Sequence, residues 1–186
     1  MEIKITTNHT LLVLQLLSWI IFIGLCIDAG GIIVHTIITL FINHGGVKNF
    51  WEGADYLSSI YDFDKGYFIV ITLVMSIVAI LKSTMFYLIV KLFSEKTLDF
   101  QKPFSMELRG FILNLSYLSL GIGLFSHAGF KYSDWLTAQG LSPSADMNSL
   151  HISGSDVWIF IAVILMVIAQ IVKRGVEIQS ENDLTV

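Results

Sequence analysis

The sequence predicts an all-α integral membrane protein, a bundle of four transmembrane helices with both termini in the cytoplasm. Of its 186 residues, 54% are apolar and only 14% are charged, whereas a soluble domain usually carries about 25% charged residues. This deficit indicates that much of the surface faces something other than water. Four long apolar stretches, and the distribution of lysine and arginine between them, complete the prediction of a single membrane domain over residues 1–186.

The four apolar stretches set the number of spans. They cover approximately residues 11–42, 67–93, 110–128 and 157–172. An α-helix of about 20 apolar residues crosses a bilayer, so the second and third stretches suffice, the first is long enough to tilt, and the fourth is slightly short. The runs are continuous rather than alternating, and each is too long for a barrel strand of about 9–11 residues, so helices are expected.

The orientation follows from the tendency of lysine and arginine to gather in cytoplasmic loops. The predicted inner loop, residues 94–109, and the tail, residues 173–186, are richer in these residues than the outer loops, residues 43–66 and 129–156. Both termini are therefore expected inside. Aromatic residues in the first outer loop favour either a short helix at the membrane surface or an aromatic belt. The second outer loop is expected to be irregular, and Pro103 is a candidate first residue of the third helix.

Three charged side chains, Asp28, Lys82 and Lys91, lie inside the apolar stretches, and Asp28 and Lys82 are the strongest functional signal in the sequence. A charge at the bilayer centre costs about 2.5–3.5 kcal/mol on insertion scales, and it normally faces the bundle interior with a partner. The two residues lie at similar depths counted from the outer ends of their spans, but differ by about 9 Å counted from the inner ends. Three interpretations stay open: a structural ion pair, a Lys82 that reaches toward the cytoplasm while hydroxyls cap Asp28, and a proton or ion relay.

Small and polar residues mark two helix faces that are expected to point inward. The stripe in the first span consists of Gly24, Asp28, Gly31 and His35. The stripe in the third span consists of Asn114, Tyr117, Gly121 and Ala128. Because small residues let neighbouring helices approach closely, the two faces are expected to meet across the bundle. The polar candidates for a site inside the membrane are therefore Asp28, Lys82, His35, Asn114 and Tyr117.

No catalytic or metal-binding motif is recognisable in the sequence. It has no Walker loop, no dinucleotide fingerprint and no GxSxG elbow. Imidazole ligates metals, but the outer histidines lack ligand spacing such as HExxH, and no clustered carboxylate or cysteine joins them. These histidines are His35, His44, His127 and His151. We expect no catalytic residue, no metal and no cofactor, and the net charge of −4 comes with no basic stripe for direct binding of nucleic acid.

The C-terminal stretch carries a family resemblance. The chain ends in Glu-Asn-Asp-Leu-Thr-Val, residues 181–186, preceded by Gly175 and the pair Glu177-Ile178. This ending, together with Pro103-Phe104 in the inner loop, resembles the bacterial family of four-span membrane proteins called domain of unknown function 2975 (DUF2975). The resemblance implies a multi-pass protein of the bacterial cytoplasmic (inner) membrane with no assigned activity. It also implies genes for small helix-turn-helix regulators nearby, and so a cytoplasmic regulator of that kind as a partner.

The tail is a candidate docking element for such a partner. Its acidic and apolar candidates are Glu177, Ile178, Glu181, Asp183 and Leu184. The fourth span can continue past Lys173 as a helix with Gly175 as a weak point, and the alternative is a frayed, solvated end. We therefore predict a non-enzymatic sensor or regulator whose partners are the lipid bilayer and a cytoplasmic protein. The alternative is a small transporter or channel subunit that uses Asp28 and Lys82, and an enzyme with a membrane-buried site ranks last.

Overall fold

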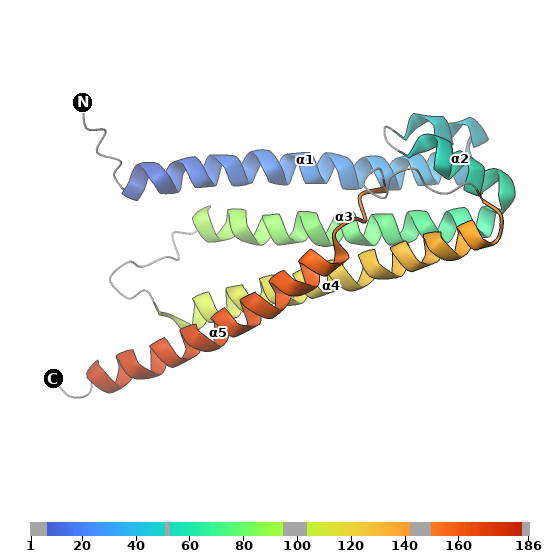
Figure 1. The fold of residues 1–186 in the computed structure, drawn as a ribbon. Coiled ribbons are helices and arrows are strands. Elements are labelled where there is room, and N and C mark those ends of the chain that lie inside the picture. The colour runs from blue at the N-terminus through green and yellow to red at the C-terminus, as the bar shows by residue number, and fades with distance from the viewer. Residues whose placement is uncertain (1–6, 51–52, 95–103, 142–149, 184–186) are drawn as a thin grey trace, which may run out of the picture.

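The computed structural model describes residues 7–50, 53–94, 104–141 and 150–183, and these residues are organised as helices. Four helices are long and apolar enough to cross a membrane, which confirms the predicted fold class. They are α1 (Thr7–Phe41), α3 (Lys65–Ser94), α4 (Met106–Ala138) and α5 (Ser155–Asp183). The four helices run lengthwise through an elongated bundle, and α1 begins at the same end at which α5 finishes (Figure 1).

The helices pack in the order in which they follow along the chain. α1 packs against α3, α3 against α4, and α4 against α5, and no comparable contact joins α1 to α4 in the described residues. The expectation that the inward faces of the first and third spans meet is therefore wrong. Asn114, Tyr117 and Ala128 are exposed, and Gly24 of α1 has open space around it. The reason is that another face of α4 carries the small residues that the packing uses.

A seam of serines and glycines on α4 makes these contacts. The seam consists of Ser116, Ser119, Gly123, Ser126, Gly129 and Ser133, all of them buried. A Cβ placed on Gly123 would lie 3.0 Å from the amide nitrogen of Ile159 and 3.0 Å from the carbonyl oxygen of Ser155, so the backbones of α4 and α5 nearly touch there. Ser116 Oγ also donates a hydrogen bond of 2.8 Å to the carbonyl of Ala162. Small residues and interhelical hydrogen bonds are what hold helices together in lipid.

The loop between α1 and α3, predicted to lie outside, forms two short helices that cap one end of the bundle. They are η1 (His44–Asn49) and α2 (Ala54–Phe63), at the end opposite to the start of α1 (Figure 1). The side chain of Asn43 caps η1 by accepting from the amide of Gly45. Phe50 and Tyr61 are buried and both meet the ring of Phe68, with centroids 6.4 and 5.3 Å apart. The structure shows a short helix in this loop, with Tyr56 and Tyr61 buried and Phe63 53% exposed.

Two boundaries differ from the prediction. α4 continues to Ala138, well beyond the expected end at residue 128, because its last turns pack against α2 and α3. There the hydroxyls of Tyr56 and Ser133 lie 2.6 Å apart, and the rings of Tyr67 and Trp135 meet edge to face. Burial raises the pKa of the Tyr56 hydroxyl, and the hydrogen bond with Ser133 only partly offsets this.

α5 continues without a break through Gly175 to Asp183, as expected for a fourth span that runs on past Lys173 as a helix. The side chain of Ser105 caps the start of α4 by accepting from the amide of Leu108. Pro103, the candidate first residue of this helix, lies outside the described residues, as does Leu184.

Candidate functional site

Three polar residues from three parts of the chain meet inside the bundle. Asp28 of α1 and Lys82 of α3 lie within candidate membrane spans, with apolar residues on both sides along each helix. Between them lies His151, whose Nδ1 is 3.2 Å from Oδ2 of Asp28. The ammonium group of Lys82 donates a hydrogen bond of 2.8 Å to the carbonyl oxygen of His151. The two charges that the sequence singled out are thus brought to one place, and a single residue joins them.

This geometry differs from the interpretations of Asp28 and Lys82 that the sequence left open. No direct ion pair joins the two in the described part of the chain, since His151 stands between them. The ammonium group of Lys82 contacts the segment before α5, whereas the second interpretation placed it toward one membrane surface. Sequence reasoning noted His151 only as one of several outer histidines. The signal that could have found it is the pair of apolar neighbours, Leu150 and Ile152, in a loop otherwise rich in Ser and Gly.

His151 belongs to a short stretch outside the α-helices, residues Leu150–Gly154, which we call the re-entrant segment. Its apolar side chains are buried: Leu150 is 0% exposed and Ile152 is 1% exposed. Gly129 of α4 makes room for it, because a Cβ there would lie 2.9 Å from Cδ1 of Ile152. The segment lies against α1 and α3 about half-way along the bundle and leads directly into α5 (Figure 1). Non-helical backbone at such a depth is tolerated where protein buries it.

The other predicted polar candidates do not join this cluster. His35 is half-buried, and its ring lies 5.6 Å from that of Phe50 under the outer cap. Asn114 is exposed on α4, and Tyr117 is 58% exposed. The structure therefore brings together Asp28 and Lys82 alone among the five candidates, and adds His151.

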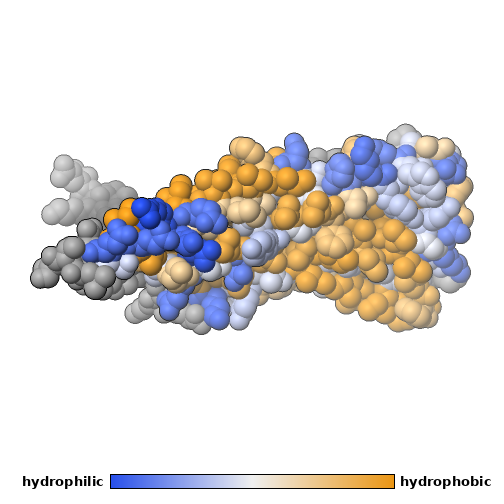
Figure 2. All heavy atoms as spheres, turned by 90° about the horizontal axis from the view of Figure 1, so that it is seen from below, coloured by the Kyte–Doolittle hydropathy of each residue, from blue (hydrophilic) through white to orange (hydrophobic). Residues whose placement is uncertain are grey.

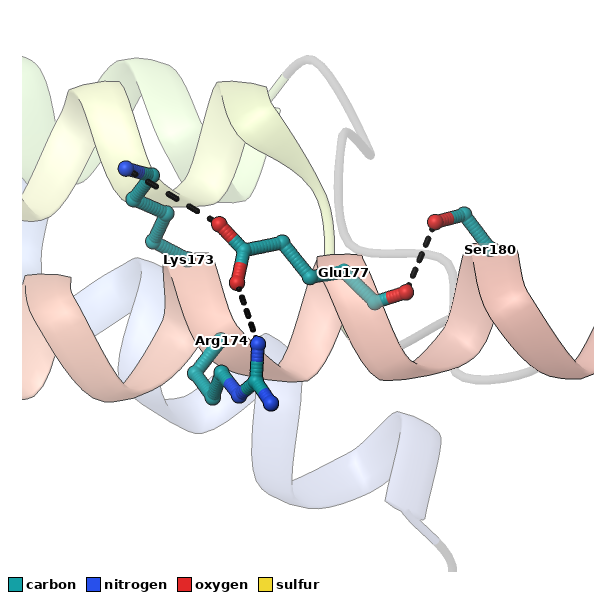
Figure 3. Close-up of polar contacts among 4 residues, drawn as sticks. All are labelled: Lys173, Arg174, Glu177 and Ser180. Atoms are coloured by element: carbon teal, nitrogen blue, oxygen red, sulfur yellow. Dashed lines mark hydrogen bonds and ion pairs between the residues drawn. The ribbon is translucent and has the colours of Figure 1, made fainter.

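The C-terminal part of α5 forms a second polar region. Glu177 is held by two neighbours, with its carboxylate 2.9 Å from Nη1 of Arg174 and 3.8 Å from Nζ of Lys173, and Ser180 Oγ donates to its backbone carbonyl (Figure 3). Its charge is therefore largely compensated within the helix. Of the other docking candidates, Ile178 is 47% exposed and Glu181 is exposed. Asp183 is the last residue of α5.

This polar region begins where the bundle ends. The ring of Phe104, just before α4, lies against the backbone of Gly175, so that a Cβ there would be 2.6 Å from Cδ1. The residues of α5 that follow Gly175 extend about 12 Å past this point at 1.5 Å per residue. Figure 2 shows apolar side chains over the middle of the bundle and hydrophilic ones toward both ends. Ile178 and Glu181 are thus exposed on the part of α5 that extends past Phe104.

Comparison with family models identifies the family of this chain. The model of the family described as protein of unknown function (DUF2975) matches residues 52–186, which confirms the resemblance seen in the sequence. The matched region takes in Lys82, the re-entrant segment and α5, whereas α1 with Asp28 precedes it. A search of curated proteins and a search of solved structures each found no match.

Proposed function

The chain belongs to the DUF2975 family, whose description assigns no activity, and from this premise we propose that it is a non-enzymatic membrane regulator that engages a cytoplasmic partner through the end of α5. One observation supports this above all. α5 is a single helix from the re-entrant segment to Asp183, so it connects the polar cluster inside the bundle with exposed residues beyond it. A continuous helix is stiff enough to pass a displacement from one end to the other.

The orientation is part of the proposal. The lysine and arginine bias of the inner loop and tail favours a cytoplasmic location for the end at which α1 begins and α5 finishes. The membrane is then the bacterial cytoplasmic membrane, as the family resemblance implies. The tail offers the apolar side chain of Ile178 and the carboxylate of Glu181, because Glu177 is already paired. An acidic tail is complementary to a helix-turn-helix regulator, whose DNA-binding face is basic.

The test is photo-crosslinking in living cells of the source organism. A photoreactive residue replaces Ile178, and a matched control replaces Phe160, which is 65% exposed on the same helix within the apolar span. We expect a cytoplasmic protein to be captured at position 178 and not at position 160, and Glu181→Lys to reduce that capture. Deleting residues 177–186 should abolish the regulatory output while Asp28→Asn preserves the partner contact. Equal capture at both positions would count against the proposal.

A second candidate function is supported by the polar cluster. Ionisable groups inside a membrane mark proton and ion pathways, and Asp28, Lys82 and His151 form such a group. A small transporter or channel subunit should move protons or ions in liposomes that contain the purified protein, with a pH-sensitive dye as reporter. Asp28→Asn should abolish that flux, and deletion of residues 177–186 should leave it intact. A regulator should show no flux above that of protein-free liposomes.

A further inference from the structure

α5 is joined to the rest of the bundle in two ways. It packs along α4 over much of its length, and among the described elements it has no comparable contact with α1 or α3. The re-entrant segment supplies the other connection, because His151 contacts Asp28 of α1 and Lys82 of α3. α5 is therefore positioned relative to the α1–α3 pair through α4, which packs against α3, and through this segment, which contacts both α1 and α3.

Two charged side chains hold the same residue of the segment by different groups. Lys82 donates to the backbone carbonyl of His151, and Asp28 meets its ring. Hydrogen bonds with an ionised partner are roughly twice as strong as neutral ones. A carbonyl outside a helix and away from water must find a protein donor, and Lys82 is that donor.

The backbone of His151 shows that the segment is held under constraint. Its φ is 57°, in the left-handed region that glycine adopts freely and other L-residues adopt at a cost. Such conformations persist where the surroundings over-determine them. What histidine adds over glycine at this position is the ring contact with Asp28. Gly154, with φ of 75°, then provides a joint directly before α5 begins at Ser155.

We propose that the re-entrant segment is a latch that sets the position of α5. While Asp28 and Lys82 hold His151, α5 stays in one register on the seam of α4. When the latch opens, the joint at Gly154 lets α5 shift along that seam, and its exposed end moves with it. The latch would regulate the partner contact proposed above, so its biological role rests on that proposed function. Its opening and the displacement of α5 are tested on the purified protein alone.

The first experiment measures opening of the latch. Cys26, the single cysteine, is replaced by serine, and Ser153, a half-buried residue of the segment, becomes the only thiol. The full-length protein in detergent is labelled with a maleimide. Because a hydrogen bond to a charged group is worth about 1.5–3 kcal/mol, Lys82→Met and His151→Ala should each speed labelling roughly 10-fold to 100-fold. Asp156→Asn, an exposed carboxylate beside the segment, is the control and should leave the rate unchanged.

A second variant guards against simple misfolding. His151→Gly relieves the backbone strain and keeps the carbonyl for Lys82 while it deletes the ring, so its labelling rate should lie between those of the parent and His151→Ala. All variants should elute as the parent does in gel filtration. Unchanged labelling in Lys82→Met, His151→Ala and His151→Gly would overturn the latch.

The second experiment measures the displacement of α5. Spin labels at Leu12 and Ile178, which are 64% and 47% exposed, report the distance between the start of α1 and the end of α5. The parent should give a narrow distance distribution, and Lys82→Met a broader or shifted one. Faster labelling at position 153 with an unchanged distance distribution would overturn the coupling of the latch to α5. Neither result involves the partner, so a failure here is distinct from a failure of the crosslinking test.

Discussion

Gly123 lies where the backbones of α4 and α5 come closest, and one added methyl group there is predicted to destabilise the protein. A Cβ at this position would lie 2.6 Å from Cγ1 of Ile159, and 3.0 Å from both the amide nitrogen of Ile159 and the carbonyl oxygen of Ser155. The side-chain atom can turn away, but the two backbone atoms cannot. Gly123→Ala must therefore push α5 outward, near the hydrogen bond between Ser116 and Ala162.

The magnitude follows from three contributions. Alanine favours a helix over glycine by about 1 kcal/mol, overpacking a close contact costs about 1–3 kcal/mol, and the weakened Ser116–Ala162 hydrogen bond costs on the order of 1 kcal/mol. We therefore expect Gly123→Ala to lower the free energy of unfolding by about 1–3 kcal/mol. Gly110 lies in the same helix with nothing within 4 Å of its Cβ position. Gly110→Ala should keep only the helix-propensity gain of up to about 1 kcal/mol.

The assay is thermal unfolding of the full-length protein in detergent, followed by circular dichroism. One kcal/mol corresponds to roughly 2–4 °C in Tm for a domain of this size, so the two variants should move in opposite directions from the parent. The comparison is matched, because both replace glycine with alanine in α4. If Gly123→Ala melts at the same temperature as Gly110→Ala or above it, the close approach of α4 and α5 does not exist.

Three further predictions test other parts of the structure. Tyr56→Phe leaves the buried hydroxyl of Ser133 without its partner and should cost about 1–2 kcal/mol, and adding Ser133→Ala should recover part of this, as a double-mutant cycle of melting temperatures would show. Ser116→Ala should cost on the order of 0.6 kcal/mol, the average for interhelical hydrogen bonds in membranes, and a loss well above this would contradict the assignment of an average bond at this position. In cells, a cysteine at Ser59 of α2 should react with an impermeant thiol reagent and one at Ser94 should not, whereas the reverse labelling would invert the topology.

The number and type of the spans were readable from the sequence because lipid imposes them locally. A long continuous apolar run needs no distant partner to become a helix, since each backbone group bonds within the run. The short helix in the loop between α1 and α3 could also be anticipated, because the aromatic residues of that loop indicated burial or an interface. The end of α4 could not be predicted from the sequence. Tyr132 and Trp135 look like loop residues until their contacts with the ring of Tyr67 are known.

The packing faces were harder to predict, and α4 shows why. The expected stripe gave weight to Asn114 and Tyr117 as polar residues inside a membrane, yet both are exposed. The buried seam includes Ser116 and Ser119, whose small side chains carry little signal of their own. Two residues adjacent in sequence lie about 100° apart on a helix of 3.6 residues per turn. An error of one position therefore changes which neighbour a helix faces.

The polar cluster could be half predicted. Asp28 and Lys82 stood out because a charge inside an apolar run is costly wherever its partner lies. His151 did not, because it is 69 residues from Lys82 in the chain and reaches it only through a segment without periodic pattern. No pattern in the sequence indicated that this segment packs into the bundle. That packing depends on Gly129, which leaves space for Ile152.

The re-entrant segment also imposes an order of assembly on the chain. Lys82 of α3 donates to the backbone carbonyl of His151, and Asp28 of α1 contacts its ring. The segment therefore reaches its final position only after those two helices are in the membrane and packed together. Helices that insert first and associate later provide such a sequence of events. The contacts of residues 150–154 with Asp28 and Lys82 are therefore expected to form after α1 and α3 have packed together. A chain whose first helix fails to insert would lack Asp28 at this place, and the ring of His151 would lose that contact.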